Sequence, residues 1–141
     1  MKKSKNIYDN KSLHSIVVIF YMEVIIMLKI KINSRYFEII KDKYLNGRIA
    51  LYLYNEEEIV NLTVNIPEAI LLSDVIGDEV NSSILNHIDG YSYEELIDVL
   101  VDSNIITSFQ NGEVQCGFNH YKGIIINGAK LNKMRNFKNV I

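Results

Sequence analysis

Four side chains in the sequence are of the types that most often perform acid–base chemistry, nucleophilic attack or zinc binding: His14, His87, His120 and Cys116. The histidines have no second His or Cys at zinc-ligand spacing, so no metal site is predicted. His87 lies near Asp89 and His120 beside Tyr121, and either could carry a proton. A lone histidine is more often a surface or core residue. We therefore predict a protein that is not an enzyme, with no catalytic residues and no cofactor.

Two further candidates for chemistry have simpler interpretations. Cys116 is predicted to lie on the same face as Ile105 and Phe118, as a small buried apolar residue. It is the only cysteine, which excludes an internal disulfide and fits a reducing cytoplasm. The segment Asn46-Gly47-Arg48 lacks the strand-loop-helix context and the lysine of a phosphate-binding loop, so we expect a turn.

The charges are sorted along the chain. The 15 basic and 17 acidic residues give a net charge of -2, yet no Lys or Arg occurs between Arg48 and Lys122. Thirteen of the 17 acids lie in that interval, which leaves four for the flanks that hold every basic residue. A near-neutral total therefore hides a strongly acidic middle.

This acidic middle allows two interpretations. The acids can be the solvated faces of a helix and its loops, kept for solubility. Alternatively, seven of them form a rigid acidic surface that a basic cleft on a host protein would attract. The seven are Glu56, Glu57, Glu58, Glu94, Glu95, Asp98 and Asp102. Proteins whose clefts normally hold nucleic acid are the expected partners, whereas the net charge makes nucleic acid itself an unlikely ligand.

Residues 1–26 are kept out of the functional argument. The apolar run from Ser15 to Leu28 is shorter than a membrane span and contains Glu23, and no small-residue cleavage site follows it. We therefore predict no stable membrane insertion. Two alternatives remain: an N-terminal amphipathic helix, or an upstream extension before a true start at Met27, because Met22-Glu23-Val24 can be encoded by a ribosome-binding sequence. The domain is assigned to residues 27–131 and a basic tail to 132–141.

Two hairpins are predicted from alternating apolar residues. In the first, Ile30 faces Phe37 and Leu28 faces Ile39 across an Asn33-Ser34 turn. In the second, residues 49, 51 and 53 pair with 64, 62 and 60 across the loop 55–58, with these apolar residues on one face. The polar residues Asn61, Thr63 and Asn65 point to the other face.

A helix is predicted at Ser92–Asp102, where Ser92 and Glu95 have the spacing of a capping box and Tyr93, Leu96, Val99 and Leu100 form the buried stripe. Asn111-Gly112 predicts a hairpin turn that places Phe109 opposite Val114 and Ile105 opposite Phe118. A last strand is expected at Tyr121–Ile126. The fold class is α+β, with one antiparallel sheet of about six or seven strands and one packed helix. The last strand would be an exposed edge through which a homodimer could form.

Four short motifs stand in order along the chain: Tyr44–Leu51 (YLNGRIAL), Thr63–Pro67 (TVNIP), Asp78–Val80 (DEV) and a short acidic helix closing with Asn104–Ile106. The set resembles an uncharacterised family of small domains on phages, plasmids and integrative elements, whose members have YxNGRxAL, TVNLP, DEV and EAGI in this order. The likeness covers about residues 28–131 and fails between Val80 and Gly90, where the family's IKDYSENEG is replaced. It implies a mobile-element accessory protein and brings no catalytic residues.

The leading expectation is a non-enzymatic, cytoplasmic accessory protein that inhibits a host defence or nucleic-acid-binding protein through the acidic surface. One alternative is direct binding to nucleic acid or a membrane surface through the basic flanks. Another is a small-molecule-binding domain or small enzyme.

Overall fold

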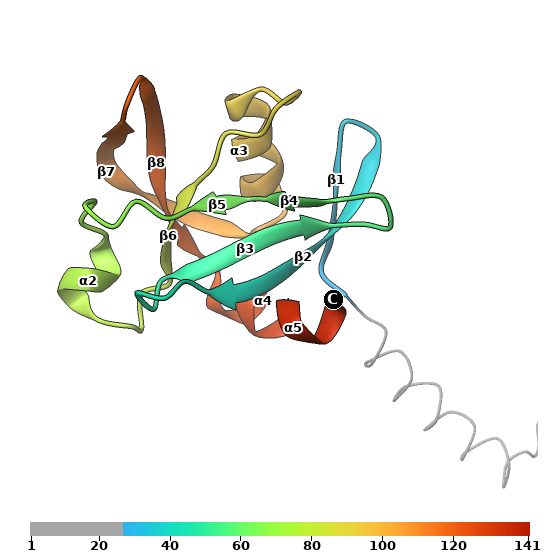
Figure 1. The fold of residues 1–141 in the computed structure, drawn as a ribbon, viewed down its shortest axis with the longest axis horizontal. Coiled ribbons are helices and arrows are strands. Elements are labelled where there is room, and N and C mark those ends of the chain that lie inside the picture. The colour runs from blue at the N-terminus through green and yellow to red at the C-terminus, as the bar shows by residue number, and fades with distance from the viewer. Residues whose placement is uncertain (1–26) are drawn as a thin grey trace, which may run out of the picture.

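The computed structural model describes residues 27–141, so the interpretations of residues 1–26 lie outside the described residues (Figure 1). Within this part of the chain, no helix has the length and apolar character needed to cross a membrane. The strands are β1 Lys29–Ile32, β2 Arg35–Lys43, β3 Ile49–Tyr54, β4 Ile59–Asn61, β5 Thr63–Val64, β6 Ser82–Leu85, β7 Ile106–Cys116, β8 Asn119–Ile126 and β9 Arg135–Asn136. The helices are α2 Leu72–Ile76, α3 Tyr93–Asp102, α4 Gly128–Lys133 and α5 Phe137–Val140.

The fold is α+β, as predicted, but its strands form two sheets rather than one. The first sheet has the order β1-β2-β3-β4, with β9 added in parallel beside β2, and the second has the order β5-β6-β8-β7. The four helices of the described residues are short and surround these sheets (Figure 1).

The first predicted hairpin is confirmed. Ile30 pairs with Phe37, and the Ile39 amide donates to the Leu28 carbonyl at 2.8 Å. Asn33 and Ser34 have φ of 48° and 71°, the pair of positive angles that a two-residue type I′ turn requires.

The second hairpin is confirmed only in its first half. Leu53 pairs with Val60, and the Leu62 amide still donates to the Leu51 carbonyl at 3.0 Å. Thr63, however, pairs with Leu85 of β6 and is buried. Its hydroxyl contacts the Tyr44 hydroxyl at 2.8 Å and accepts from the Leu51 amide at 3.0 Å, so its polar group is satisfied. The chain thus crosses from the first sheet to the second at this residue.

The prediction of a hairpin turn at Asn111-Gly112 is wrong. Phe109 pairs with Ile124, and Glu113 is the next β7 residue in register, opposite Lys122, so Gln110, Asn111 and Gly112 form a bulge against Gly123. The turn lies at Gly117-Phe118 instead, where Cys116 pairs with Asn119. Val114 therefore faces Tyr121, not Phe109, and Phe118 is fully exposed at the tip of the β7–β8 arm, away from Ile105.

Two other expectations about this region are also corrected. Cys116 is exposed rather than buried, because it lies in the part of β7 that extends beyond the sheet. Strand β8, which includes Tyr121–Ile126, lies between β6 and β7 and is not an edge. A homodimer formed by edge pairing of the second sheet would need β7 or β5.

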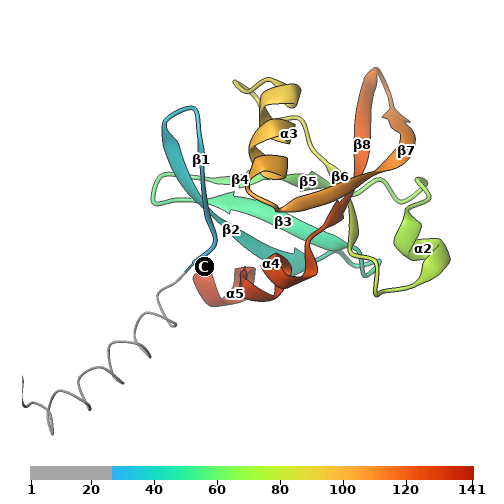
Figure 2. The ribbon, with the colours of Figure 1, turned by 180° about the vertical axis from the view of Figure 1, so that it is seen from behind.

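The predicted helix is confirmed as α3, with Leu96 and Leu100 buried. The Ser92 hydroxyl accepts from the Glu95 amide at 3.3 Å, which is the forward half of the capping box. Figure 2 shows α3 on one side of β2 and β3 and the α4–α5 segment on the other. The main core lies under α3 and between the two sheets, and it includes Met134 from the C-terminal segment.

Candidate binding groove

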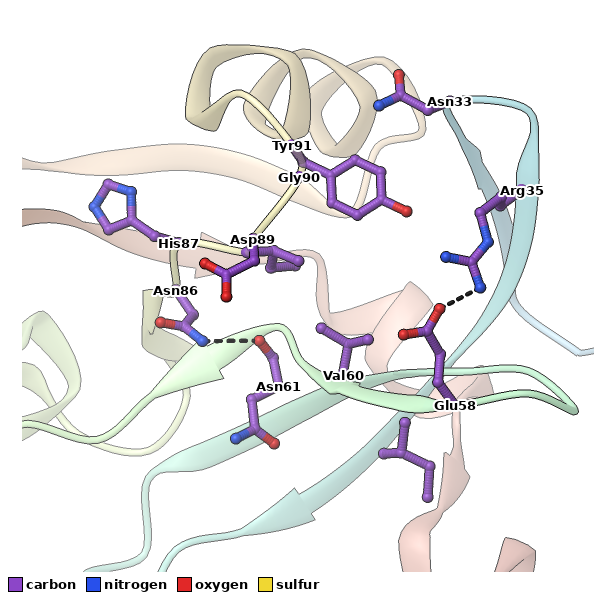
Figure 3. A pocket seen from close by; sticks show the side chains of 12 residues that line it. Asn33, Arg35, Glu58, Val60, Asn61, Asn86, His87, Asp89, Gly90 and Tyr91 are labelled. Atoms are coloured by element: carbon purple, nitrogen blue, oxygen red, sulfur yellow. Dashed lines mark hydrogen bonds and ion pairs between the residues drawn. The ribbon is translucent and has the colours of Figure 1, made fainter.

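An open groove of about 650 Å³ lies beside α3 (Figure 3). Three segments far apart in the sequence form it: the β1–β2 turn, the edge strand β4, and the loop between β6 and α3. Its lining residues are Asn33, Arg35, Glu58, Ile59, Val60, Asn61, Asn86, His87, Ile88, Asp89, Gly90 and Tyr91.

One wall is the acidic loop between β3 and β4. The Asn55 side-chain oxygen accepts from the amides of Glu57 and Glu58 at 2.9 and 3.0 Å, which fixes the loop backbone. Arg35 on β2 forms ion pairs with both carboxylates, with 3.1 Å to Glu57. The hydrogen bond that Arg35 donates to Glu58 raises the pKa of Arg35, so this guanidinium keeps its charge.

The opposite wall is the loop from Asn86 to Tyr91. Asn86 ties the loop to the first sheet, because its backbone amide donates to the Leu62 carbonyl at 2.9 Å and its side chain donates to the Asn61 carbonyl at 3.0 Å. Gly90, with φ of 86°, allows the tight turn that follows. Asp89 projects from this loop toward the groove (Figure 3) and has no cation within ion-pair distance among residues 27–141.

The groove also borders free backbone groups. Strand β4 ends the first sheet, and the hydrogen bond from the Asn55 amide to the Glu58 carbonyl fixes which residues bond to β3. By the alternation of antiparallel pairs, the N–H and C=O of Ile59 point away from β3. The groove therefore offers hydrogen-bonding backbone as well as carboxylates.

His87 and His120 both contact the β7–β8 arm, whereas His14 lies outside the described residues. The Nε2 atom of His87 lies 2.6 Å from the His120 carbonyl, and its ring stacks on Tyr93 with centroids 4.0 Å apart. Figure 3 shows the His87 ring directed away from Asp89. His120 lies 3.6 Å from Glu113 on the exposed arm. Neither ring converges with other polar groups in the way a proton-transfer site requires.

The structure brings only part of the predicted acidic surface together. Glu57 and Glu58 meet at Arg35, and Glu58 alone of the seven acids lines the groove. Glu56 is exposed beside them on the same loop. The other four acids are exposed on α3, which begins directly after the groove loop: Glu94, Glu95, Asp98 and Asp102.

Sequence reasoning missed the groove residues Arg35, Asp89 and Tyr91. Arg35 carried no signal, because its neighbour Glu58 is 23 positions away and the contact depends on the strand register. Asp89 was considered only as a neighbour of His87 and as one of the thirteen acids, and neither observation pointed to a groove. Within residues 27–141, no three His, Cys, Asp or Glu side chains gather closely enough to hold a metal ion.

Comparison with protein-family models, with curated proteins and with solved structures gave no match.

Proposed function

We propose that this protein is a binding protein that engages a basic protein partner through the groove and the acidic residues around it. The observation that carries the proposal is the charge balance. Of the thirteen acids between Arg48 and Lys122, only Glu57, Glu58, Asp74 and Glu113 have a cation within ion-pair distance among residues 27–141. Nine carboxylates therefore remain without one in this part of the chain.

The groove supplies a site for a side chain of the partner. Its two carboxylates, Glu58 and Asp89, face a single cation, Arg35, which already binds Glu57 and Glu58. A lysine or arginine of the partner would pair with Asp89, and the surrounding acids would speed the encounter. The fixed backbone of the β3–β4 loop lowers the conformational entropy lost on binding.

The finer proposal concerns the identity of the partner. A protein whose own cleft normally holds nucleic acid presents the clustered Lys and Arg that this surface complements. Together with the likeness to mobile-element domains, this supports an accessory protein that inhibits a host defence or nucleic-acid-handling protein.

The test is capture of the partner from the native host by tagged protein, read by mass spectrometry at about 50 and 200 mM salt, where screening differs. The test variant carries Glu56→Gln, Glu57→Gln and Asp89→Asn. The control variant carries Glu68→Gln, Asp78→Asn and Glu79→Gln, which remove the same charge outside the groove. We expect to capture a basic partner, in smaller amounts at the higher salt concentration. Its capture should fall about tenfold in the test variant only.

Equal capture by both variants and the unmodified protein would contradict the proposal. Equal losses in both variants would assign the effect to total charge and would also contradict a groove site.

A further inference from the structure

A second cavity, of about 420 Å³, lies at the other end of β2 from the acidic groove, because the groove contains Arg35 and this cavity contains Lys41 and Lys43. It is formed where the end of β2 and the start of β3 meet the C-terminal segment, which Figures 1 and 2 both show below these strands and away from α3. Its lining residues are Lys41, Asp42, Lys43, Ile49, Leu131, Asn132, Asn136 and Lys138.

Three lysines and one acid line the cavity, so its lining carries a net positive charge. Lys41, Lys43 and Lys138 have no carboxylate within ion-pair distance among residues 27–141. The single acid of the lining, Asp42, accepts a hydrogen bond from the backbone amide of Lys43 at 2.8 Å. Like charges that share a cavity repel one another, and a bound anion would turn this repulsion into attraction.

The lysines differ in how firmly they are placed. Lys41 is half-buried on β2, and its ammonium donates to the Leu131 carbonyl of α4 at 3.0 Å, which holds it at the cavity wall. Lys43 lies two residues further along the same strand and therefore on the same face. An anion at this wall would meet one ammonium held by a hydrogen bond, Lys41, and one exposed lysine, Lys43.

The remaining lining is suited to more than a bare anion. Ile49 and Leu131 supply the apolar part of the lining, and with Lys43 they also line a smaller cavity of about 210 Å³. The side chains of Asn132 and Asn136 can both donate and accept hydrogen bonds. Ligand sites combine apolar walls with a few polar groups in this way.

We propose that this cavity binds a small phosphorylated molecule with an apolar or aromatic body, of the chemical class of a mononucleotide. The lysines bind the phosphate, and the apolar wall and the asparagines contact the body. A strand of nucleic acid is the less suitable ligand, because tight binding of a strand needs a row of phosphate contacts rather than one enclosed site. This site is independent of the proposed partner surface, so either proposal can fail alone.

The experiment is isothermal titration calorimetry of the full chain at about 50 mM salt with AMP, inorganic phosphate and adenosine as separate probes. AMP is expected to bind more tightly than inorganic phosphate, and adenosine weakest. The variants Lys41→Met and Lys43→Gln should each weaken AMP binding about tenfold. The control variants Lys130→Gln and Lys133→Gln remove the same charge from α4 outside the cavity lining and should change affinity less than about threefold.

Urea unfolding of each variant shows whether a loss of AMP binding comes from the removed side chain or from unfolding of the protein. Absence of AMP binding to the unmodified chain would overturn the proposal, as would equal losses in the test and control variants. Tighter binding of a single-stranded oligonucleotide, or of phosphatidylglycerol vesicles, than of AMP would replace the small phosphorylated ligand with a strand or a lipid headgroup.

Discussion

Arg48 is a buried cation whose guanidinium has acceptors on several sides. It donates to the Ile66 carbonyl at 2.8 Å, to the Ala69 carbonyl and to Asp74 at 2.8 Å. Arg48→Met would leave the Ala69 carbonyl without this donor and Asp74 without its cation, and we expect a loss of about 3 kcal/mol in the free energy of unfolding, measured by urea titration.

The control for this variant is Arg35→Met, which removes an exposed guanidinium with two carboxylate partners. Exposed ion pairs contribute little to stability, so Arg35→Met should lose much less than Arg48→Met. If the two variants lost the same stability, the buried network of Arg48 would have no special role.

Asp74 adds a pH dependence to the same network. The hydrogen bond from the Leu71 amide, followed by the contact with Arg48, lowers the pKa of the Asp74 carboxyl from its ordinary 3.8. The folded state thus binds this proton less readily than the unfolded state, so the stabilisation is present above pH 3.8 and is lost as the pH falls through the folded pKa.

Asp74→Asn should therefore flatten the fall of the urea midpoint below about pH 4. The matched control is Asp98→Asn on the exposed face of α3. It should leave the low-pH fall of the urea midpoint, the acid limb of the curve, as it is in the unmodified protein. An unchanged slope in Asp74→Asn would show that Asp74 does not contribute to the acid limb.

At the scale of elements, Tyr93 explains why the second sheet opens toward the β7–β8 arm. Strands β6 and β8 pair through Ile84 and Gly123, and the next pair in register would be Leu85 and Lys122. The Tyr93 hydroxyl lies between these two residues, since it donates to the Leu85 carbonyl at 2.7 Å and accepts from the Lys122 amide at 2.9 Å. One side chain of α3 thus replaces a backbone hydrogen bond of the sheet.

Burial of this hydroxyl raises the pKa of Tyr93 to about 12. The folded state keeps a proton that the unfolded state releases near pH 10, so this stabilisation is complete below pH 10 and is lost as the pH rises to about 12. Tyr93→Phe should cost about 1 to 3 kcal/mol at neutral pH and should reduce the alkaline decline of the urea midpoint.

Tyr44 and Tyr52 also have raised pKa values, so the urea midpoint of Tyr93→Phe should still fall at high pH. Its pH dependence must therefore be compared with that of the unmodified protein. Tyr36→Phe, at a side chain that is 63% exposed, is the control and should cost little. If Tyr93→Phe left the high-pH fall of the urea midpoint unchanged, the Tyr93 hydroxyl would not be the group that causes it.

The sequence predictions succeeded where the contacts join residues close in sequence and failed where they join distant residues. The Asn33-Ser34 hairpin and α3 are determined by residues within a few positions, and both are confirmed. The Asn111-Gly112 turn failed because two glycines, Gly112 and Gly117, have positive φ, and only the pairing of β8 with β6 decides which of them ends the strand. The acids could be named from the sequence, whereas the groove depends on segments about 50 residues apart and could not.

At the scale of the whole molecule, the two charged regions lie at opposite ends of strand β2. The acidic groove contains Arg35 at the start of the strand, and the lysine-lined cavity contains Lys41 and Lys43 at its end. Such a molecule can associate with its own copies through unlike faces. This heterologous contact differs from a homodimer formed by pairing of sheet edges, because it consists of exposed charges and is screened by salt.

Light scattering at two salt concentrations distinguishes these two modes of association. We expect an apparent mass above that of the monomer at about 10 mM salt and high protein concentration, and the monomer mass at about 200 mM salt, where the screening length is shorter than the distance between most of the exposed charges. Lys130→Gln with Lys133→Gln should reduce the low-salt association. A dimer mass that persists at about 200 mM salt would instead indicate backbone pairing, because edge hydrogen bonds depend little on ionic strength. The edge strands β4, β5 and β7 would then be the strands to interrupt.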